Sequence, residues 1–104
     1  MSQPIYRLTK AADKDFEEII RYTLDDHGIR QVQKYSALLL SCLNNLAKNK
    51  GHIRRMPDIH SDLRYIRCEH HYIFGLKQQK GPIIIFAILH ERMEMLQRIS
   101  DRLE

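Results

Sequence analysis

Pro82-Ile83-Ile84-Ile85-Phe86-Ala87-Ile88-Leu89, followed directly by His90-Glu91-Arg92-Met93, is the stretch of sequence that decides the fold. The first eight residues carry no charge, and four of them are isoleucines, a composition typical of a central strand that is buried on both faces. Pro82 suits the first position of such a strand, where it removes no hydrogen bond from the middle of the sheet. Polar side chains begin where the apolar run ends, so we expect functional groups at this end of the strand, supported by a rigid element.

Two shorter strand-like segments precede this one. The three segments span residues 63–69, 72–77 and 83–89, and they are separated by His70-His71 and by Gln78-Gln79-Lys80-Gly81. This spacing predicts an antiparallel meander. On the first strand, alternation places Arg64, Ile66 and Cys68 on one face and Leu63, Tyr65 and Arg67 on the other. Basic side chains should therefore stand on the sheet itself.

The first half of the chain predicts a strand and a helical hairpin. Residues 5–8 alternate weakly, as a short strand would, and Thr9 can cap a helix that ends at His27-Gly28. A second helix, with an apolar stripe from Val32 to Leu46, should end between residues 49 and 51. Residues 93–104 fit a short amphipathic C-terminal helix. We therefore expect an α+β fold over residues 1–104 as a single domain: an N-terminal strand, an α-helical hairpin packed on an antiparallel β-sheet meander, and a short C-terminal helix.

Charge is distributed unevenly along the chain. The formal net charge is +4, and all of the excess lies in residues 48–104, which hold eleven basic and seven acidic residues. Five of the six histidines also lie there. An acidic partner, either nucleic acid or an anionic protein segment, is the natural inference, although a solvated basic surface without a partner has the same composition. The hairpin could also be a DNA-reading helix-turn-helix, but the second helix is dominated by leucine rather than by base-reading side chains.

The sequence gives no sign of a metal site or a membrane segment. Cys42 and Cys68 follow no zinc-ligand or C-x-x-C spacing, so we expect two reduced cysteines in the core. The segment from His52 to Asp62 holds metal-ligand residue types but no recognisable spacing. The N-terminus lacks the apolar region of a signal peptide, and no apolar run reaches the roughly 18 residues that span a bilayer. We expect a cytoplasmic protein that needs no cofactor or metal.

The order of elements and several short motifs resemble the ParE branch of the RelE/ParE toxin superfamily. The motifs are Tyr22-Thr23 in the first helix, Leu46-Ala47-Lys48-Asn49 closing the second, Leu63-Arg64 opening the meander, Tyr72-Ile73-Phe74 in its middle, and Ile88-Leu89-His90-Glu91-Arg92-Met93 at its end. The resemblance covers nearly the whole chain. It implies the toxin half of a type II toxin-antitoxin pair, bound and silenced by a cognate antitoxin protein in a hetero-oligomer.

Two modes of action are known in that superfamily. ParE-like members inhibit DNA gyrase, whereas RelE-like members cleave messenger RNA on the ribosome. Metal-independent cleavage needs an acid or base and cations around the phosphate, which His90, Arg64, Arg67 and Arg92 could supply. The chain lacks the C-terminal tyrosine that is typical of several RelE-like nucleases. Action by binding is therefore favoured, with the ribosome-dependent endoribonuclease as the alternative and a non-enzymatic nucleic-acid-binding module as the second alternative.

The C-terminal segment is the predicted target-binding region. Its apolar and basic residues are Arg92, Met93, Met95, Leu96, Arg98, Ile99 and Arg102. The same apolar stripe could instead pack on the sheet. Other candidates have ordinary structural explanations as well: His90 could hydrogen-bond a backbone carbonyl, His70-His71 could form a turn, and Arg64 and Arg67 could pair with surface acids such as Glu69, Asp62 or Glu91.

Overall fold

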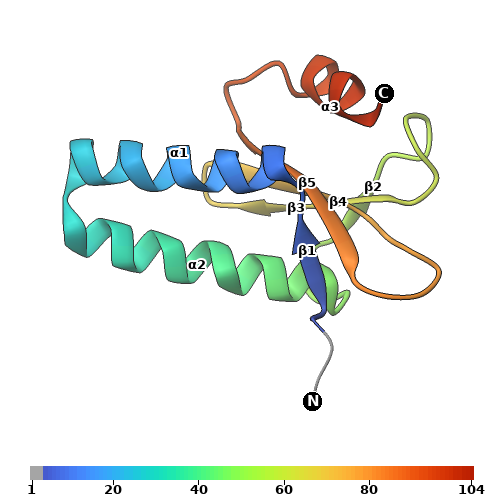
Figure 1. Ribbon diagram of the computed structural model, residues 1–104, viewed down its shortest axis with the longest axis horizontal. Helices are drawn as coiled ribbons and strands as arrows, with labels where there is room; N and C mark the ends of the chain where they lie inside the picture. The colour runs from blue at the N-terminus through green and yellow to red at the C-terminus, as the bar shows by residue number, and fades with distance from the viewer. Residues whose placement is uncertain (1–3) are drawn as a thin grey trace.

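A five-stranded sheet and three helices make up the computed structural model, which describes residues 4–104 (Figure 1). The elements along the chain are β1 (Tyr6–Leu8), α1 (Lys10–His27), α2 (Ile29–Ala47), β2 (Arg54–Arg55), β3 (Leu63–Cys68), β4 (His71–Leu76), β5 (Ile83–His90) and α3 (Met95–Leu103). Residues 1–3, which the sequence analysis included in the domain, lie outside the described residues. This order confirms the predicted α+β fold class. Within the described part of the chain, no helix is long and apolar enough to cross a membrane.

The sheet has the strand order β1-β5-β4-β3-β2. β3, β4 and β5 form the predicted antiparallel meander, and β1 pairs with β5 in parallel, with Tyr6 opposite Ile83 and Leu8 opposite Ile85. The first half of β5 thus has a strand on each side, which explains why its sequence needs no charge. β2 was not predicted, because Arg54 and Arg55 are two exposed residues without any apolar alternation.

The helical hairpin forms as its capping residues indicate. The Thr9 hydroxyl accepts a hydrogen bond from the backbone N–H of Ala12 at 3.1 Å and so caps α1. At the other end, Gly28 has φ of 84°, a conformation that other residues adopt at a cost, and it joins α1 to α2. The hairpin covers one face of the sheet and α3 lies over the other (Figure 1).

Two apolar clusters fill the two faces of the sheet. The cluster under the hairpin holds Ala12, Ile19, Tyr35, Leu39, Leu43, Leu46, Ile66, Cys68, Ile73, Ile83, Ile85 and Ile88. The cluster under α3 holds Leu63, Phe74, Phe86, Ala87, Leu89 and Ile99. Ile66 and Cys68 therefore face the hairpin, whereas Leu63 faces α3, as the alternation along β3 predicts.

A β-bulge interrupts the pairing of β4 with β5. Phe74 pairs with Ala87 and the next residue, Gly75, pairs with Ile85, so that Phe86 is an extra residue in β5. A bulge bends its strand and disturbs the ladder of hydrogen bonds locally. The bulge lies just past the end of β1, where β5 has lost its strand partner on that side.

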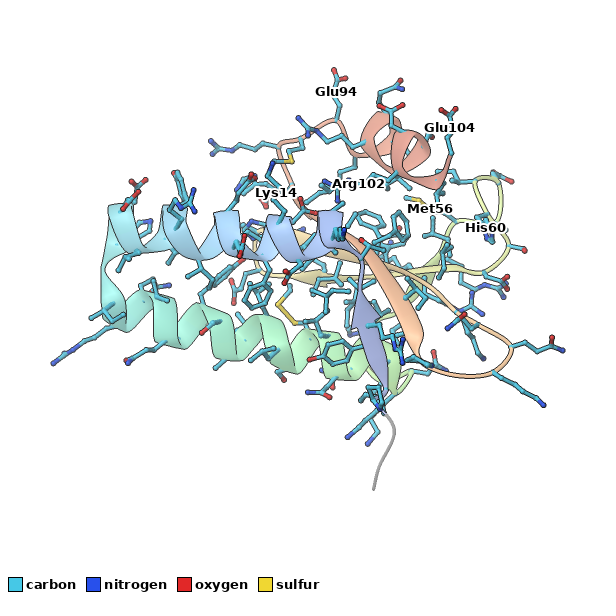
Figure 2. The ribbon with its side chains drawn as sticks, in the orientation of Figure 1. Lys14, Met56, His60, Glu94, Arg102 and Glu104 are labelled. Atoms are coloured by element: carbon cyan, nitrogen blue, oxygen red, sulfur yellow. A yellow bond between two sulfur atoms is a disulfide. The ribbon has the colours of Figure 1, made fainter. Side chains whose placement is uncertain are left out.

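Side chains from α1 and α3 provide hydrogen-bond partners for the backbone of β5 along this edge, where it has no neighbouring strand. The Asp15 carboxylate accepts a hydrogen bond from the Ile88 N–H at 2.9 Å, and the Arg102 guanidinium donates to the Phe86 carbonyl at 3.0 Å. Arg102 and Asp15 also bind each other through two hydrogen bonds of 2.5 and 2.9 Å. We call this pair the Asp15–Arg102 clamp. Figure 2 shows Arg102 between α3 and the first turns of α1, near Lys14.

The two cysteines lie in the core as predicted, but the prediction that they are reduced is wrong. Cys42 of α2 and Cys68 of β3 form a disulfide across the hairpin-facing cluster (Figure 2). Their sequence separation of 26 matches no redox or metal motif. Only the packing of α2 on β3 brings their Cα atoms to 6.2 Å, a distance that a disulfide can bridge.

Candidate functional site

The C-terminal segment divides into side chains that pack on the sheet and side chains that face solvent. α3 begins at Met95, two residues later than predicted, and Ile99 is fully buried under it. Met95 is partly buried against the same cluster. Ile99 and Met95 therefore anchor α3 on the sheet, and a role for them as target contacts stays a prediction.

Four of the predicted target-binding residues remain accessible. Met93 and Leu96 are 41% and 61% exposed, and the side chains of Arg92 and Arg98 are exposed as well. We call these four residues the C-terminal contact surface. Arg102, in contrast, is engaged in the clamp, where its hydrogen bonds to Asp15 raise the pKa of the guanidinium. A direct contact of Arg102 with the target likewise stays a prediction.

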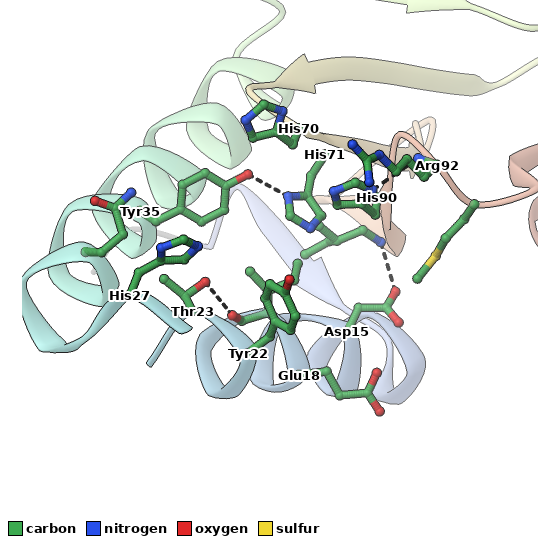
Figure 3. Close-up of a pocket in the computed structure, with 14 residues that line it drawn as sticks. Asp15, Glu18, Tyr22, Thr23, His27, Tyr35, His70, His71, His90 and Arg92 are labelled. Carbon is green, nitrogen blue, oxygen red and sulfur yellow. Dashed lines mark hydrogen bonds between the residues drawn. The ribbon is translucent and has the colours of Figure 1, made fainter. Parts of the chain in front are cut away.

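A groove of about 680 Å³ continues from the contact surface toward the hairpin. Arg92 and Met93 belong to both. Tyr22, Thr23 and Ile19 of α1 line one side of the groove, and His70, His71 and His90 line the other. Figure 3 shows the three histidines gathered beside Arg92, with Tyr22 and Thr23 facing them from α1. We call this groove the histidine groove.

The floor of the histidine groove contains a buried tyrosine–histidine pair. The hydroxyl of Tyr35, a residue only 9% exposed, lies 2.5 Å from Nδ1 of His71 (Figure 3). Burial, reinforced by the nearby His90 and His70, lowers the pKa of His71 to about 4, so its ring is neutral at physiological pH. Burial likewise raises the pKa of Tyr35. This pair is a structural hydrogen bond that ties α2 to the start of β4.

This pair was not predicted from the sequence. The turn predicted at His70-His71 is present at His70, but His71 is the first residue of β4 and pairs with Cys68 and His90 on its two sides. The one available signal was Tyr35 itself, because a tyrosine on the apolar stripe of a helix needs a partner for its hydroxyl. Which residue supplies that partner depends on strand pairing that no local pattern reveals.

Within residues 4–104, His90 does not make the hydrogen bond to a backbone carbonyl that was considered from the sequence, but it does contact the backbone. Its Nδ1 accepts a hydrogen bond from the N–H of Arg92 at 3.1 Å, rather than donating to a carbonyl. The His90 ring lies 5.1 Å from the ring of His71 and 6.3 Å from that of His70. Glu91 follows and binds Arg67 at 3.2 Å, which confirms that Arg67 has a surface ion pair.

The four residues of the alternative nuclease assignment are not brought together. Arg64 pairs with Gly75 of β4, which in turn pairs with Ile85 of β5. Arg64 therefore lies two strands away from β5 and is offset along the strand direction by five residues, about 16 Å, from His90. Arg67 stands on the opposite face of β3 from Arg64 and is held by Glu91. Within residues 4–104, no group of three His, Cys, Asp or Glu side chains is placed to hold a metal ion.

The fold and this geometry define a small α+β protein whose accessible features are a contact surface and an adjoining groove. A family model for the ParE toxin of the type II toxin-antitoxin system parDE matches residues 6–95. The chain therefore belongs to the ParE toxin family of type II toxin-antitoxin systems.

Individual relatives agree with this membership. The chain is 42% identical to Toxin ParE of Escherichia coli over 99 residues, which covers 95% of this chain and 96% of that protein. It is 29% identical to Toxin ParE1 of Mycobacterium tuberculosis over 90 residues, covering 86% and 92% of the two chains. A chain from the chromosomal ParDE toxin-antitoxin system of P. aeruginosa has the same fold, with a TM-score of 0.65, 17% identity, and coverage of 82% and 92%.

Proposed function

We propose that residues 1–104 form one cytoplasmic toxin domain, which arrests growth by binding and inhibiting DNA gyrase and is neutralised by a cognate antitoxin. The gyrase target rests on resemblance to the ParE branch. Action by binding rests on the chain itself, because His90, Arg64, Arg67 and Arg92 do not converge on one point as a phosphate-cleaving site requires. In this proposal the toxin has no catalytic residue.

The observation that carries the proposal is the C-terminal contact surface. Met93 and Leu96 expose apolar area on the same short segment that carries the exposed cations of Arg92 and Arg98. Arginine is enriched in interface hot spots, and methionine adapts its shape to the partner. Ile99 and the Asp15–Arg102 clamp attach α3, which carries Leu96 and Arg98, to the sheet.

A gyrase supercoiling assay with purified protein tests the proposal. Leu96→Asp places a charge at the centre of the contact surface, and we expect it to raise the concentration needed for half inhibition by about tenfold or more. Leu40→Asp is the matched control, because Leu40 is 45% exposed on α2, away from the surface. Equal inhibition by Leu96→Asp and wild type, with both folded, would remove the contact surface from the proposal. No inhibition of supercoiling by the wild type would remove gyrase as the target.

We infer that the antitoxin covers the histidine groove and reaches the contact surface from there. Arg92 and Met93 line both, so a segment that fills the groove also blocks the target contact. Tyr22, 65% exposed at the groove wall, offers the antitoxin an aromatic anchor. Tyr22→Asp should therefore still arrest growth when expressed alone, but should need several times more co-expressed antitoxin for rescue. Rescue at the wild-type level would argue against this docking mode.

One substitution distinguishes this proposal from the alternative of a ribosome-dependent endoribonuclease. His90→Gln keeps a hydrogen-bond acceptor for the Arg92 N–H but removes an acid or base, which a nuclease needs for about two to four orders of magnitude of its rate. We expect His90→Gln to stay toxic and wild-type protein to leave ribosome-bound message intact. Cleavage of that message by wild type, lost in a folded His90→Gln variant, would establish the nuclease instead.

A further inference from the structure

A second concave surface, of about 780 Å³, lies at the β3 side of the sheet and shares only His70 with the lining of the histidine groove. It is lined by aromatic, basic and amide side chains that come from β2, β3, β4 and the end of α2. These side chains include Asn45, His52, Arg54, Tyr65, Arg67 and Tyr72. We call it the tyrosine–arginine surface.

Strand pairing sets the aromatic part of this surface. Tyr65 of β3 and Tyr72 of β4 stand on the same face, with ring centroids 6.1 Å apart. The guanidinium of Arg67, which is paired with Tyr72 across the strands, lies 5.6 Å from the centre of the Tyr72 ring. Glu91 holds that guanidinium in place at 3.2 Å. The result is a floor of two rings and one planar cation, formed by regular strands.

α3 leaves this floor partly open. The buried members of the cluster under α3 include Phe74, which stacks on Tyr65 at a centroid distance of 5.4 Å. Tyr65 and Tyr72 lie at the margin of the cluster and are only partly buried. Two adjacent tyrosines at a solvent-facing margin expose both ring surface and hydroxyl groups.

Basic residues outnumber acidic residues in the segments that form this surface. The side chain of Arg54 is exposed, and Arg54 is aligned with Tyr65 across the strands. Lys48 and Lys50 lie exposed in the connection that leads from α2 into β2. Glu69 lines the surface as well, and Glu91 is paired with Arg67. The surface therefore favours an anionic ligand.

We propose that the tyrosine–arginine surface binds an unpaired strand of nucleic acid. Bases stack on Tyr65 and Tyr72, while Arg54 and the lysines of the α2–β2 connection contact the phosphates. Duplex bases have their faces covered by their neighbours, so a duplex can use the cations but not the rings. An acidic peptide can likewise bind the cations, but it has no bases to stack on the tyrosine rings. The inference stands apart from the gyrase proposal, because it uses side chains of β2, β3 and β4 rather than the C-terminal contact surface and needs no gyrase.

Fluorescence anisotropy with the full chain tests the proposal. The probe is a labelled oligodeoxythymidine of about 12 nucleotides, close to the site size of other single-strand binders. A double variant, Tyr65→Leu with Tyr72→Leu, keeps apolar volume but removes stacking, and we expect about tenfold weaker binding or more. Tyr22→Leu is the matched control, because it removes an exposed tyrosine from the histidine groove. It should bind within about twofold of wild type.

A charge variant keeps the test informative if the double variant unfolds. Arg54→Gln changes one exposed side chain, and it should weaken binding several-fold. It should also reduce the salt dependence of the binding constant by the amount expected for about one phosphate contact. Arg7→Gln, an exposed position on β1 at the other edge of the sheet, has the same charge change and should leave binding unaltered.

Competition experiments identify the ligand chemistry. Unlabelled oligodeoxythymidine and oligouridine should both displace the probe. The relative strength of these two competitors distinguishes DNA from RNA as the source of the bound strand. Duplex DNA and polyglutamate at equal charge should displace it poorly. The proposal is overturned if duplex or polyglutamate competes as well as single strands, if the folded tyrosine variant binds normally, if Arg54→Gln and Arg7→Gln bind alike, or if wild-type protein does not bind at low salt.

Discussion

The helical hairpin and the C-terminal helix cover opposite faces of the same sheet but are held to it in different ways. α1 buries apolar side chains at Ala12 and Ile19, α2 buries them from Tyr35 to Leu46, and a disulfide ties α2 to β3. α3 has nine residues, one fully buried side chain, Ile99, and one clamp. The hairpin and sheet thus form the cooperative core, whereas α3 can open at a lower free energy.

This difference has a functional meaning. The predicted target contact is carried by the weakly held element, while the strongly held hairpin only supports it. Elements that rearrange on binding are usually drawn from the less stable parts of a fold. A variant of the hairpin should therefore change global stability, and a variant of the clamp should change α3 first.

The largest expected effect is on the hairpin. Leu43 is fully buried between α2 and the sheet, so Leu43→Ala should leave a cavity and lower the free energy of unfolding by about 3 kcal/mol. For a domain of this size the thermal midpoint should fall by about 10 °C or more. Leu40→Ala, at an exposed position of the same helix, should cost about 0.5 kcal/mol or less. Similar losses in urea unfolding for both variants would contradict the division of α2 into buried and exposed sides.

The clamp should give the next largest effect. Arg102→Gln leaves the Asp15 carboxylate, 12% exposed, without its cation and leaves the Phe86 carbonyl without its donor. Because Arg102 is itself 24% exposed, the loss should be about 2 kcal/mol, less than for a fully buried pair. Hydrogen exchange should accelerate in α3 while amides of the hairpin stay protected. Arg98→Gln, an exposed arginine on the same helix, serves as the control. Uniform acceleration across the chain would show that α3 belongs to the cooperative core.

Acid should weaken the contact between α2 and the sheet through His71. The pKa of His71 is about 4 in the folded protein and about 6.5 in an unfolded chain, so below pH 6.5 the unfolded state takes up a proton that the folded state refuses. The stabilisation is full above pH 6.5 and is lost as pH falls toward 4. After allowance for the partly exposed ring, the loss is about 1 to 2 kcal/mol. In urea unfolding at several pH values, His71→Gln should flatten this dependence and His52→Gln, at an exposed position, should not.

Most of the fold could be predicted because its signals are local. The charge-free run of β5, the cap at Thr9, the stop at Gly28 and the alternation along β3 each depend on a few consecutive residues. The periodicity of residues 93–104 also predicted a helix with an apolar side, and Ile99 is its buried member.

The candidate site could be predicted only in part, because its decisive contacts join residues far apart in the sequence. Arg102 and Asp15 are separated by 87 positions and meet only at the bulged edge of β5. Arg102 was therefore predicted to be a target-binding cation, and its partner Asp15 was not predicted. The pairing of Cys42 with Cys68 has the same origin, since nothing in the spacing distinguishes two packed thiols from a disulfide.

The smallest expected effect concerns the surface ion pair at the end of β5. Arg67 and Glu91 are 58% and 30% exposed, so water competes for both charges and Glu91→Gln should change the free energy of unfolding by about 0.5 kcal/mol or less. Urea unfolding checks this value, with Asp101→Gln on α3 as an exposed acidic control. A loss as large as that of Arg102→Gln would mean that the turn between β5 and α3 depends on this pair. The contrast between a buried clamp and a solvated ion pair would then fail, and α3 would be held at both of its ends.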